Sequence, residues 1–179
     1  MFGRAAGAIV LLAGLLVLGG SGLATAAPTP VPDLKPDLSS MTFLIGTWKC
    51  VATVRGKSRP DTVTFSMGLD GRWIQSHDVA PPFDQYRTRP ITTDAWLTYN
   101  QLNHLWVTVF VDDFGAYGVT TSPGWQGAAM TTIATVTNDG SSGHDTMTKL
   151  SDTSTKDVSV SVDKGGKANP PVTTLCNKQ

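Results

Sequence analysis

The feature that most constrains this chain is a series of ten short segments in which apolar and polar residues alternate. Alternation with a period of two is typical of half-buried β-strands. No helical segment long enough for a parallel crossover separates them, so we predict an all-β, antiparallel domain. The segments are residues 47–55, 61–68, 72–80, 94–99, 104–112, 116–121, 128–137, 144–150, 157–163 and 172–176.

The composition agrees with a β-rich fold. All 14 acidic residues are Asp, and the chain also has 18 Gly and 11 Pro. Because Glu is a good helix former and Gly and Pro are poor ones, this usage disfavours long helices. The 14 basic residues balance the Asp residues without forming a run, so the chain lacks the basic patch that phosphate backbones require. We therefore expect no nucleic-acid partner.

The first 26 residues are predicted to be a signal peptide. Arg4 precedes an apolar run over residues 5–18, and Ala24-Thr25-Ala26 forms an A-x-A cleavage site. The run is shorter than the roughly 20 residues that span a membrane, so we expect a secreted or periplasmic protein without a membrane anchor after cleavage. Residues 27–37 contain four prolines and are predicted to be an extended tether, which leaves residues 38–179 as the folded domain.

The two cysteines lie near opposite ends of that domain, at Cys50 and Cys176. In an exported protein such a pair predicts a disulfide, although two unpaired buried thiols are the alternative. A bond between them would place the first and last strands side by side. Closure of an up-and-down barrel requires this arrangement, and a Greek-key sandwich also permits it. The short connections between consecutive segments favour the barrel.

Gly46-Thr47-Trp48 follows a short apolar stretch and opens the first segment. It resembles the G-x-W signature of the calycins, which include lipocalins, fatty-acid-binding proteins and nitrobindin-like barrels. Residues 96–112, with Gly115, Ser122, Gly124-Trp125 and Gly127, are similar to a bacterial lipocalin-like family of exported proteins of unknown function.

The resemblance implies a lipocalin-like barrel of about ten strands with a short N-terminal helical plug, for which residues 38–45 supply one or two turns. It also implies that Trp48 closes the narrow end of the barrel. Lipocalins usually set an Arg from the last strand over this Trp, and residues 172–176 contain none. Cys50 replaces the second glycine of the nitrobindin-like G-x-W-x-G, and no His follows His144, so we expect no haem and no other cofactor.

The turn at Asp70-Gly71 allows two registers that exchange the faces of the third segment. A two-residue loop sends Arg72, Ile74, Ser76 and Asp78 inward. A three-residue loop sends Trp73, Gln75 and His77 inward, and we prefer it because burying Arg72 and Asp78 without partners would be costly. In segment 104–112 the aliphatic face, with Val107 and Val109, is the better inward candidate.

These choices define an expected ligand site inside the barrel. The long connection over residues 81–90 mixes aromatic residues with arginines, and long ordered loops are disproportionately functional. We interpret it as a lid whose Arg87 or Arg89 pairs with an acidic ligand, or else as a surface flap. The expected ligand-binding residues are Trp73, Gln75, His77, Phe83, Tyr86, Arg87, Arg89, Tyr99, Val107 and Val109.

The resulting hypothesis is an exported barrel that binds a small hydrophobic or amphipathic molecule. One alternative is an enzyme of the isomerase, cyclase or decarboxylase type, in which His77, Tyr99 or Arg87 moves a proton or polarises an acid. Another is an envelope protein with a filled core. No nucleophile motif is present, Asp112-Asp113 reads as a turn, and the three histidines lie on different segments. We therefore name no catalytic residues and no metal ligands.

Overall fold

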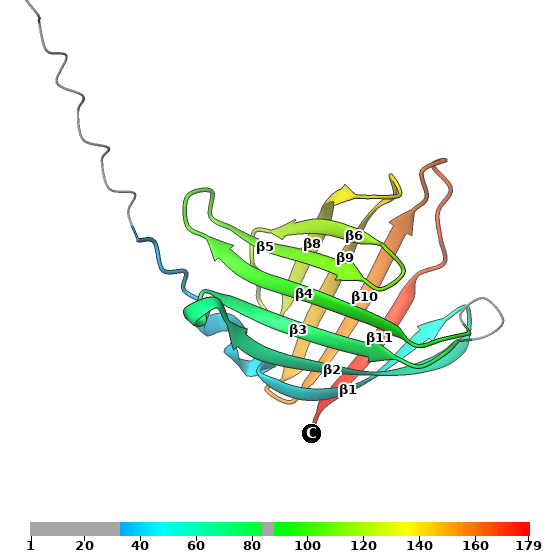
Figure 1. Cartoon of the computed structure of the whole chain (residues 1–179), viewed down its shortest axis with the longest axis horizontal. Coiled ribbons are helices and arrows are strands. Elements are labelled where there is room, and N and C mark those ends of the chain that lie inside the picture. Colours follow the sequence, from blue (N-terminus) through cyan, green and yellow to red (C-terminus); the bar gives the residue numbers. More distant parts are fainter. Residues whose placement is uncertain (1–32, 84–87) are drawn as a thin grey trace, which may run out of the picture. The chain divides into compact units, whose positions relative to one another are not determined.

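The structure is a computed structural model that describes residues 33–83 and 88–179 (Figure 1). The predicted signal peptide and most of the predicted tether lie outside the described residues. In the described part of the chain, no helix has the length and apolar character needed to cross a membrane. The elements are η1 (Ser39–Leu44), β1 (Gly46–Val54), β2 (Lys57–Gly68), η2 (Leu69–Gly71), β3 (Trp73–Ala80), β4 (Ile91–Asn100), β5 (Leu105–Asp112), β6 (Tyr117–Ser122), β7 (Trp125–Gln126), β8 (Ala129–Thr137), β9 (Ser142–Ser151), β10 (Ser154–Val162) and β11 (Val172–Lys178).

The strands form one closed antiparallel barrel, as predicted. Their order is β6-β5-β4-β3-β2-β1-β11-β10-β9-β8, with the two-residue β7 paired to β8, and a pairing between β6 and β8 closes the ring. Figure 1 shows β2 to β6 (cyan to yellow-green) as one wall, with β8 to β11 (yellow to red) crossing behind them. Closure pairs every long strand on both sides, which removes the exposed sheet edges that promote aggregation.

The predicted disulfide is present and joins the first strand to the last. Cys50 and Cys176 are direct partners in the β1–β11 pairing, and their Cα atoms are 4.0 Å apart. The bond therefore links two strands that are adjacent in space but separated by 126 positions in the chain. It lies inside the barrel, because both cysteines are buried in the core beside Trp48.

The 3₁₀ helix η1 covers one end of the barrel. Its Met41 and Leu44 are buried against Ile74 and Trp106. Trp48 is 1% exposed, and its Nε1 donates a hydrogen bond of 2.6 Å to the Leu44 carbonyl. The indole thus has both an apolar environment and a hydrogen-bond acceptor, as a buried Trp requires.

A lysine stands over Trp48 where lipocalins usually have an arginine. Strand β11 continues two residues past its predicted end, which brings Lys178 opposite Trp48. The Lys178 Nζ lies 5.8 Å from the centre of the Trp48 ring and donates a hydrogen bond of 2.8 Å to the Phe43 carbonyl. Lys178 therefore ties the last strand to both the indole and η1.

The preferred register of the β2–β3 hairpin was wrong. Met67 pairs with Ile74 and Val63 with Asp78, so the faces are those of the two-residue register, and Trp73, Gln75 and His77 point away from the interior. The expected cost of burying Arg72 is avoided, because its Nη1 donates to the Leu34 carbonyl at the closed end. The cost of burying Asp78 remains and is described below.

The face assigned to β5 was also wrong. Trp106 pairs with Tyr99 and Phe110 with Ala95, and these residues face the interior, whereas Val107 and Val109 face outward. Gly118 on β6 makes room for the Phe110 ring, because a Cβ there would lie 2.6 Å from a ring carbon and 2.8 Å from the Val136 carbonyl oxygen. The interior of this wall is therefore more aromatic and polar than its aliphatic exterior.

Candidate binding site in the barrel interior

A cavity of about 280 Å³, here called the floor chamber, lies directly above the plug. Its apolar lining includes Leu44, Val63, Phe65 and Met147. Its remaining walls carry carboxyl and hydroxyl groups beside the disulfide. The full lining is Leu44, Trp48, Cys50, Asp61, Val63, Phe65, Asp78, Met147, Thr155, Asp157, Thr174 and Cys176.

A second cavity of about 440 Å³, here called the hydroxyl chamber, adjoins the first. Asp78 from β3 and Asp157 from β10 line both chambers, so the two cavities meet at these carboxyl groups. The other lining residues carry five hydroxyls, one more carboxyl and one aromatic ring. They are Ser76, Thr108, Phe110, Thr120, Thr132, Asp145 and Ser159.

Burial raises the pKa of three of the interior carboxyl groups. Burial, reinforced by the negative charge of Asp61, raises the pKa of Asp78 to about 6, although the charges of Arg59 and His77 oppose the rise. Burial, reinforced by Asp145, raises the pKa of Asp157 to about 7, despite a hydrogen bond with the Thr155 side chain. Burial also raises the pKa of Asp61, and Arg59 opposes it. Desolvation thus dominates at each of the three.

Several interior polar atoms are buried without a hydrogen-bond partner among the described residues. They include Oδ1 of Asp61, Oδ1 of Asp78 and Nε of Arg59. Buried polar groups in folded proteins nearly always have a partner, and an unpaired one costs about 1 to 3 kcal/mol. The interior therefore holds acceptor groups whose hydrogen-bonding capacity the described chain does not use.

The raised pKa values predict that stability falls as pH increases from about 4 to about 7. These carboxyls titrate near 3.8 when unperturbed, so in this range the folded protein holds protons that the unfolded chain has released. Between pH 5 and pH 7 we expect the free energy of unfolding of the wild type to fall by about 2 kcal/mol more than that of Asp157→Asn, since one proton held over one pH unit is worth about 1.4 kcal/mol.

Urea denaturation at pH 5, 6 and 7 measures this difference. Asp70→Asn is the matched control, because Asp70 is exposed in the η2 turn between β2 and β3. Its pH dependence should follow that of the wild type. If the unfolding free energies of the wild type and Asp157→Asn changed with pH in parallel, the raised pKa of Asp157 would be contradicted.

The structure separates the residues predicted to bind a ligand. Tyr99 faces inward, and its ring centre is 5.4 Å from that of Trp106. Neither Tyr99 nor the other strand residues in the set line the floor chamber or the hydroxyl chamber. His77 places Nδ1 2.8 Å from Oδ1 of Asp94 on the outer surface, so the enzyme alternative loses His77 as an interior proton carrier. The outward-facing residues are Trp73, Gln75, His77, Val107 and Val109.

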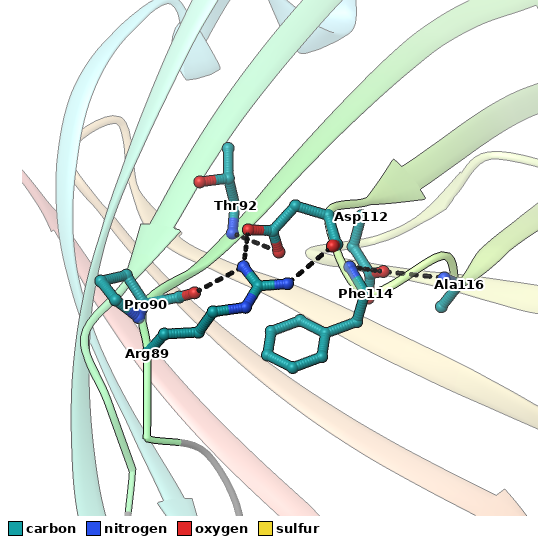
Figure 2. Close-up of polar contacts among 7 residues, drawn as sticks. Arg89, Pro90, Thr92, Asp112, Phe114 and Ala116 are labelled. Atoms are coloured by element: carbon teal, nitrogen blue, oxygen red, sulfur yellow. Dashed lines mark hydrogen bonds and ion pairs between the residues drawn. The ribbon is translucent and has the colours of Figure 1, made fainter.

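The connection between β3 and β4 is described only in part. Tyr86 and Arg87 lie outside the described residues, and Phe83 is half-buried. Arg89 makes an ion pair with the Asp113 carboxylate, donates through Nη2 to the Asp113 carbonyl at 2.8 Å, and stacks 3.9 Å from the centre of the Phe114 ring (Figure 2). Arg89 therefore anchors this connection to the β5–β6 turn. The pairing of Arg87 or Arg89 with an acidic ligand stays a prediction.

The Asp112-Asp113 pair organises the same turn. Asp112 Oδ1 accepts backbone N–H bonds from Phe114 and Ala116, and Asp113 Oδ1 accepts one from Thr92 (Figure 2). Partial desolvation raises the pKa of Asp113, but the hydrogen bonds from Arg89 and Thr92 and the guanidinium charge together hold it below the ordinary value. In the described ranges, no three His, Cys or Asp side chains are grouped so as to hold a metal ion.

Sequence reasoning missed the interior carboxyls because it turned Asp78 outward to avoid the cost of burying it and assigned no inward face to the segments that hold Asp145 and Asp157. In β10 the valines Val158 and Val160 face outward, while Asp157 and Ser159 line the cavity. One signal was available. Asp61 is in phase with the apolar residues Val63 and Phe65, which share its face of β2.

Comparisons with known proteins place the fold but no family. No protein-family model matches the chain, and no curated protein matches it. Among solved structures, the crystal structure of Rv2717c from M. tuberculosis matches with a TM-score of 0.62 at 12% sequence identity, over 82% of this chain and 99% of that one. The chain therefore shares its barrel fold with Rv2717c.

Proposed function

We propose that this protein binds a small amphipathic molecule inside its barrel. The observation that carries the proposal is the floor chamber, in which one cavity of about 280 Å³ combines an apolar surface with unpartnered buried carboxyl oxygens. Ligand pockets typically have this character, with mostly apolar walls and a few polar groups that fix orientation. The lipocalin-like architecture supports the proposal only by analogy of fold.

The lining favours an amphipathic ligand over a purely hydrophobic one. The apolar part of the ligand would contact Phe65 and Met147, and its polar part would reach Asp78 and Asp157 at the junction of the chambers. A purely apolar ligand would leave these carboxyl groups desolvated and unpaired, which is costly. The two cavities also argue against the alternative of an envelope protein whose core is simply filled.

A cavity-filling substitution tests the proposal. Titration with the neutral, environment-sensitive fluorophore N-phenyl-1-naphthylamine should show binding of one molecule per chain. Val63→Trp places an indole in the floor chamber and should weaken binding about tenfold or more. Val51→Trp is the matched control, because Val51 is 45% exposed on the outer face of neighbouring β1, and its affinity should equal that of the wild type.

Circular dichroism and thermal unfolding establish that each variant is folded. If Val63→Trp does not fold, Thr174→Leu narrows the same chamber from β11 with a smaller side chain. A folded inward variant that binds the fluorophore as the wild type does, or a wild type that binds none, would overturn the proposal.

A further inference from the structure

We infer that the barrel selects a cation and that the polar group of its ligand is a protonated amine received between Asp78 and Asp157. The inference rests on the proposed function, because it names the chemical class of the ligand for the same cavity. It goes further by excluding carboxylates and phosphates as the polar group.

The charges that line the cavity have one sign. Asp61, Asp78, Asp145 and Asp157 contribute carboxyl groups, and no Lys or Arg is among the residues that line either chamber in the described part of the chain. Arg59 lies close enough to influence Asp61 and Asp78, but it does not line a chamber. The polar groups that line the two chambers would therefore offer an anionic ligand only like charges and hydroxyls, whereas they would offer a cation up to four carboxyl groups.

The carboxyl groups of Asp78 and Asp157 lie where the two chambers meet, so one polar group of a ligand can contact both of them. Asp78 comes from β3 and Asp157 from β10, and both line the floor chamber and the hydroxyl chamber. An ammonium has three N–H donors and no acceptor, and the unpartnered Oδ1 of Asp78 can accept one of them. The five hydroxyls of the second chamber offer further acceptors, and Phe110 presents an aromatic ring to the same space.

Ionisation of Asp78 and Asp157 should make the affinity for an amine depend on pH. Asp78 is influenced by Asp61, Arg59 and His77, and Asp157 by Asp145 and Thr155. With pKa values of about 6 and about 7, the two carboxyls ionise between pH 5 and pH 8. An alkylamine stays protonated over this range, so its affinity should rise with pH, and its binding near pH 6 should release protons from the protein.

A matched set of ligands tests the inference on the full chain. Hexylamine, hexanol and hexanoate share a six-carbon skeleton and differ in their charge, and each is measured by displacement of N-phenyl-1-naphthylamine and by calorimetry at pH 7.5. We expect hexylamine to bind about tenfold or more tightly than hexanol, because hydrogen bonds to charged groups are the stronger ones. Hexanoate should bind most weakly.

Substitution of single carboxyl groups shows which residues produce the preference for hexylamine. Asp78→Asn and Asp157→Asn should each weaken hexylamine binding about tenfold while changing hexanol binding less than about twofold. Asp70→Asn removes a carboxylate from the exposed η2 turn and should change neither affinity. Calorimetry of hexylamine at pH 6 in two buffers of different ionisation enthalpy should show proton release in the wild type and less in Asp157→Asn.

The possible failures are distinguishable. If hexanol binds as tightly as hexylamine, or if the Asn variants bind hexylamine as the wild type does, the cation inference is overturned and the proposed function stands. If hexanoate binds most tightly, the assigned sign of the site is wrong. If neither the fluorophore nor any of the three ligands binds, both proposals are overturned.

Discussion

Removal of the Cys50–Cys176 disulfide should lower the free energy of unfolding by about 4 to 5 kcal/mol. The bond closes a loop of more than 100 residues, since the cysteines are 126 positions apart, and in the chain-entropy model such a loop corresponds to about 4.7 kcal/mol. The bond restricts the unfolded chain, so most of the effect does not depend on new contacts in the folded barrel. Many single domains have only 5 to 15 kcal/mol of total stability, so the loss threatens folding itself.

The double variant Cys50→Ala, Cys176→Ala, studied by urea denaturation, measures this effect. The wild type under reducing conditions is the companion experiment, because it breaks the bond without changing the composition of the buried core. Both should unfold at similarly lowered urea concentrations. A loss below about 1 kcal/mol in both would show that native-state strain or residual structure offsets the entropic contribution.

Trp48→Ala should destabilise the protein by about 3 to 5 kcal/mol. Trp48 is 1% exposed and packs under η1, where its ring stands edge-on to Phe43 with centres 6.4 Å apart. Truncation removes a large buried aromatic side chain and leaves a cavity beneath a segment too short to close over it. The hydrogen bond from Nε1 to the Leu44 carbonyl is lost as well.

Trp48→Phe separates packing from hydrogen bonding. It keeps an aromatic ring but leaves the buried Leu44 carbonyl without its indole donor, so we expect a smaller loss of about 1 to 3 kcal/mol. Equilibrium denaturation compares both variants with the wild type. If Trp48→Ala changed stability by less than about 1 kcal/mol, the view that Trp48 anchors the closed end of the barrel would be wrong.

Local sequence pattern was sufficient for the strands and for the closure of the barrel. Period-two alternation and turn residues such as Asn138-Asp139-Gly140 mark where strands run and where they end. The positions of Cys50 and Cys176 near the two ends of the domain indicated which strands meet. These features depend on neighbouring residues and on one covalent pairing, so they can be read without coordinates.

The direction that each strand face points was decided only by the tertiary structure. Alternation shows that Trp73 and Ile74 lie on opposite faces, but the choice of inward face follows from pairing with the neighbouring strands. The expected inward faces of β3 and β5 were both wrong, because this barrel encloses carboxyls and hydroxyls.

The candidate site consequently could not be assembled from the sequence. Asp78 and Asp157 lie on different walls and are 79 positions apart in the chain, yet both line the same two chambers. Closure of the barrel brings them together, and their raised pKa values arise from burial that exists only in the folded state. The sequence by itself determined the strands, the turns and the disulfide, because these are local or covalent. Only the tertiary structure decided which residues face the cavity and what charge it carries, because both depend on register and desolvation.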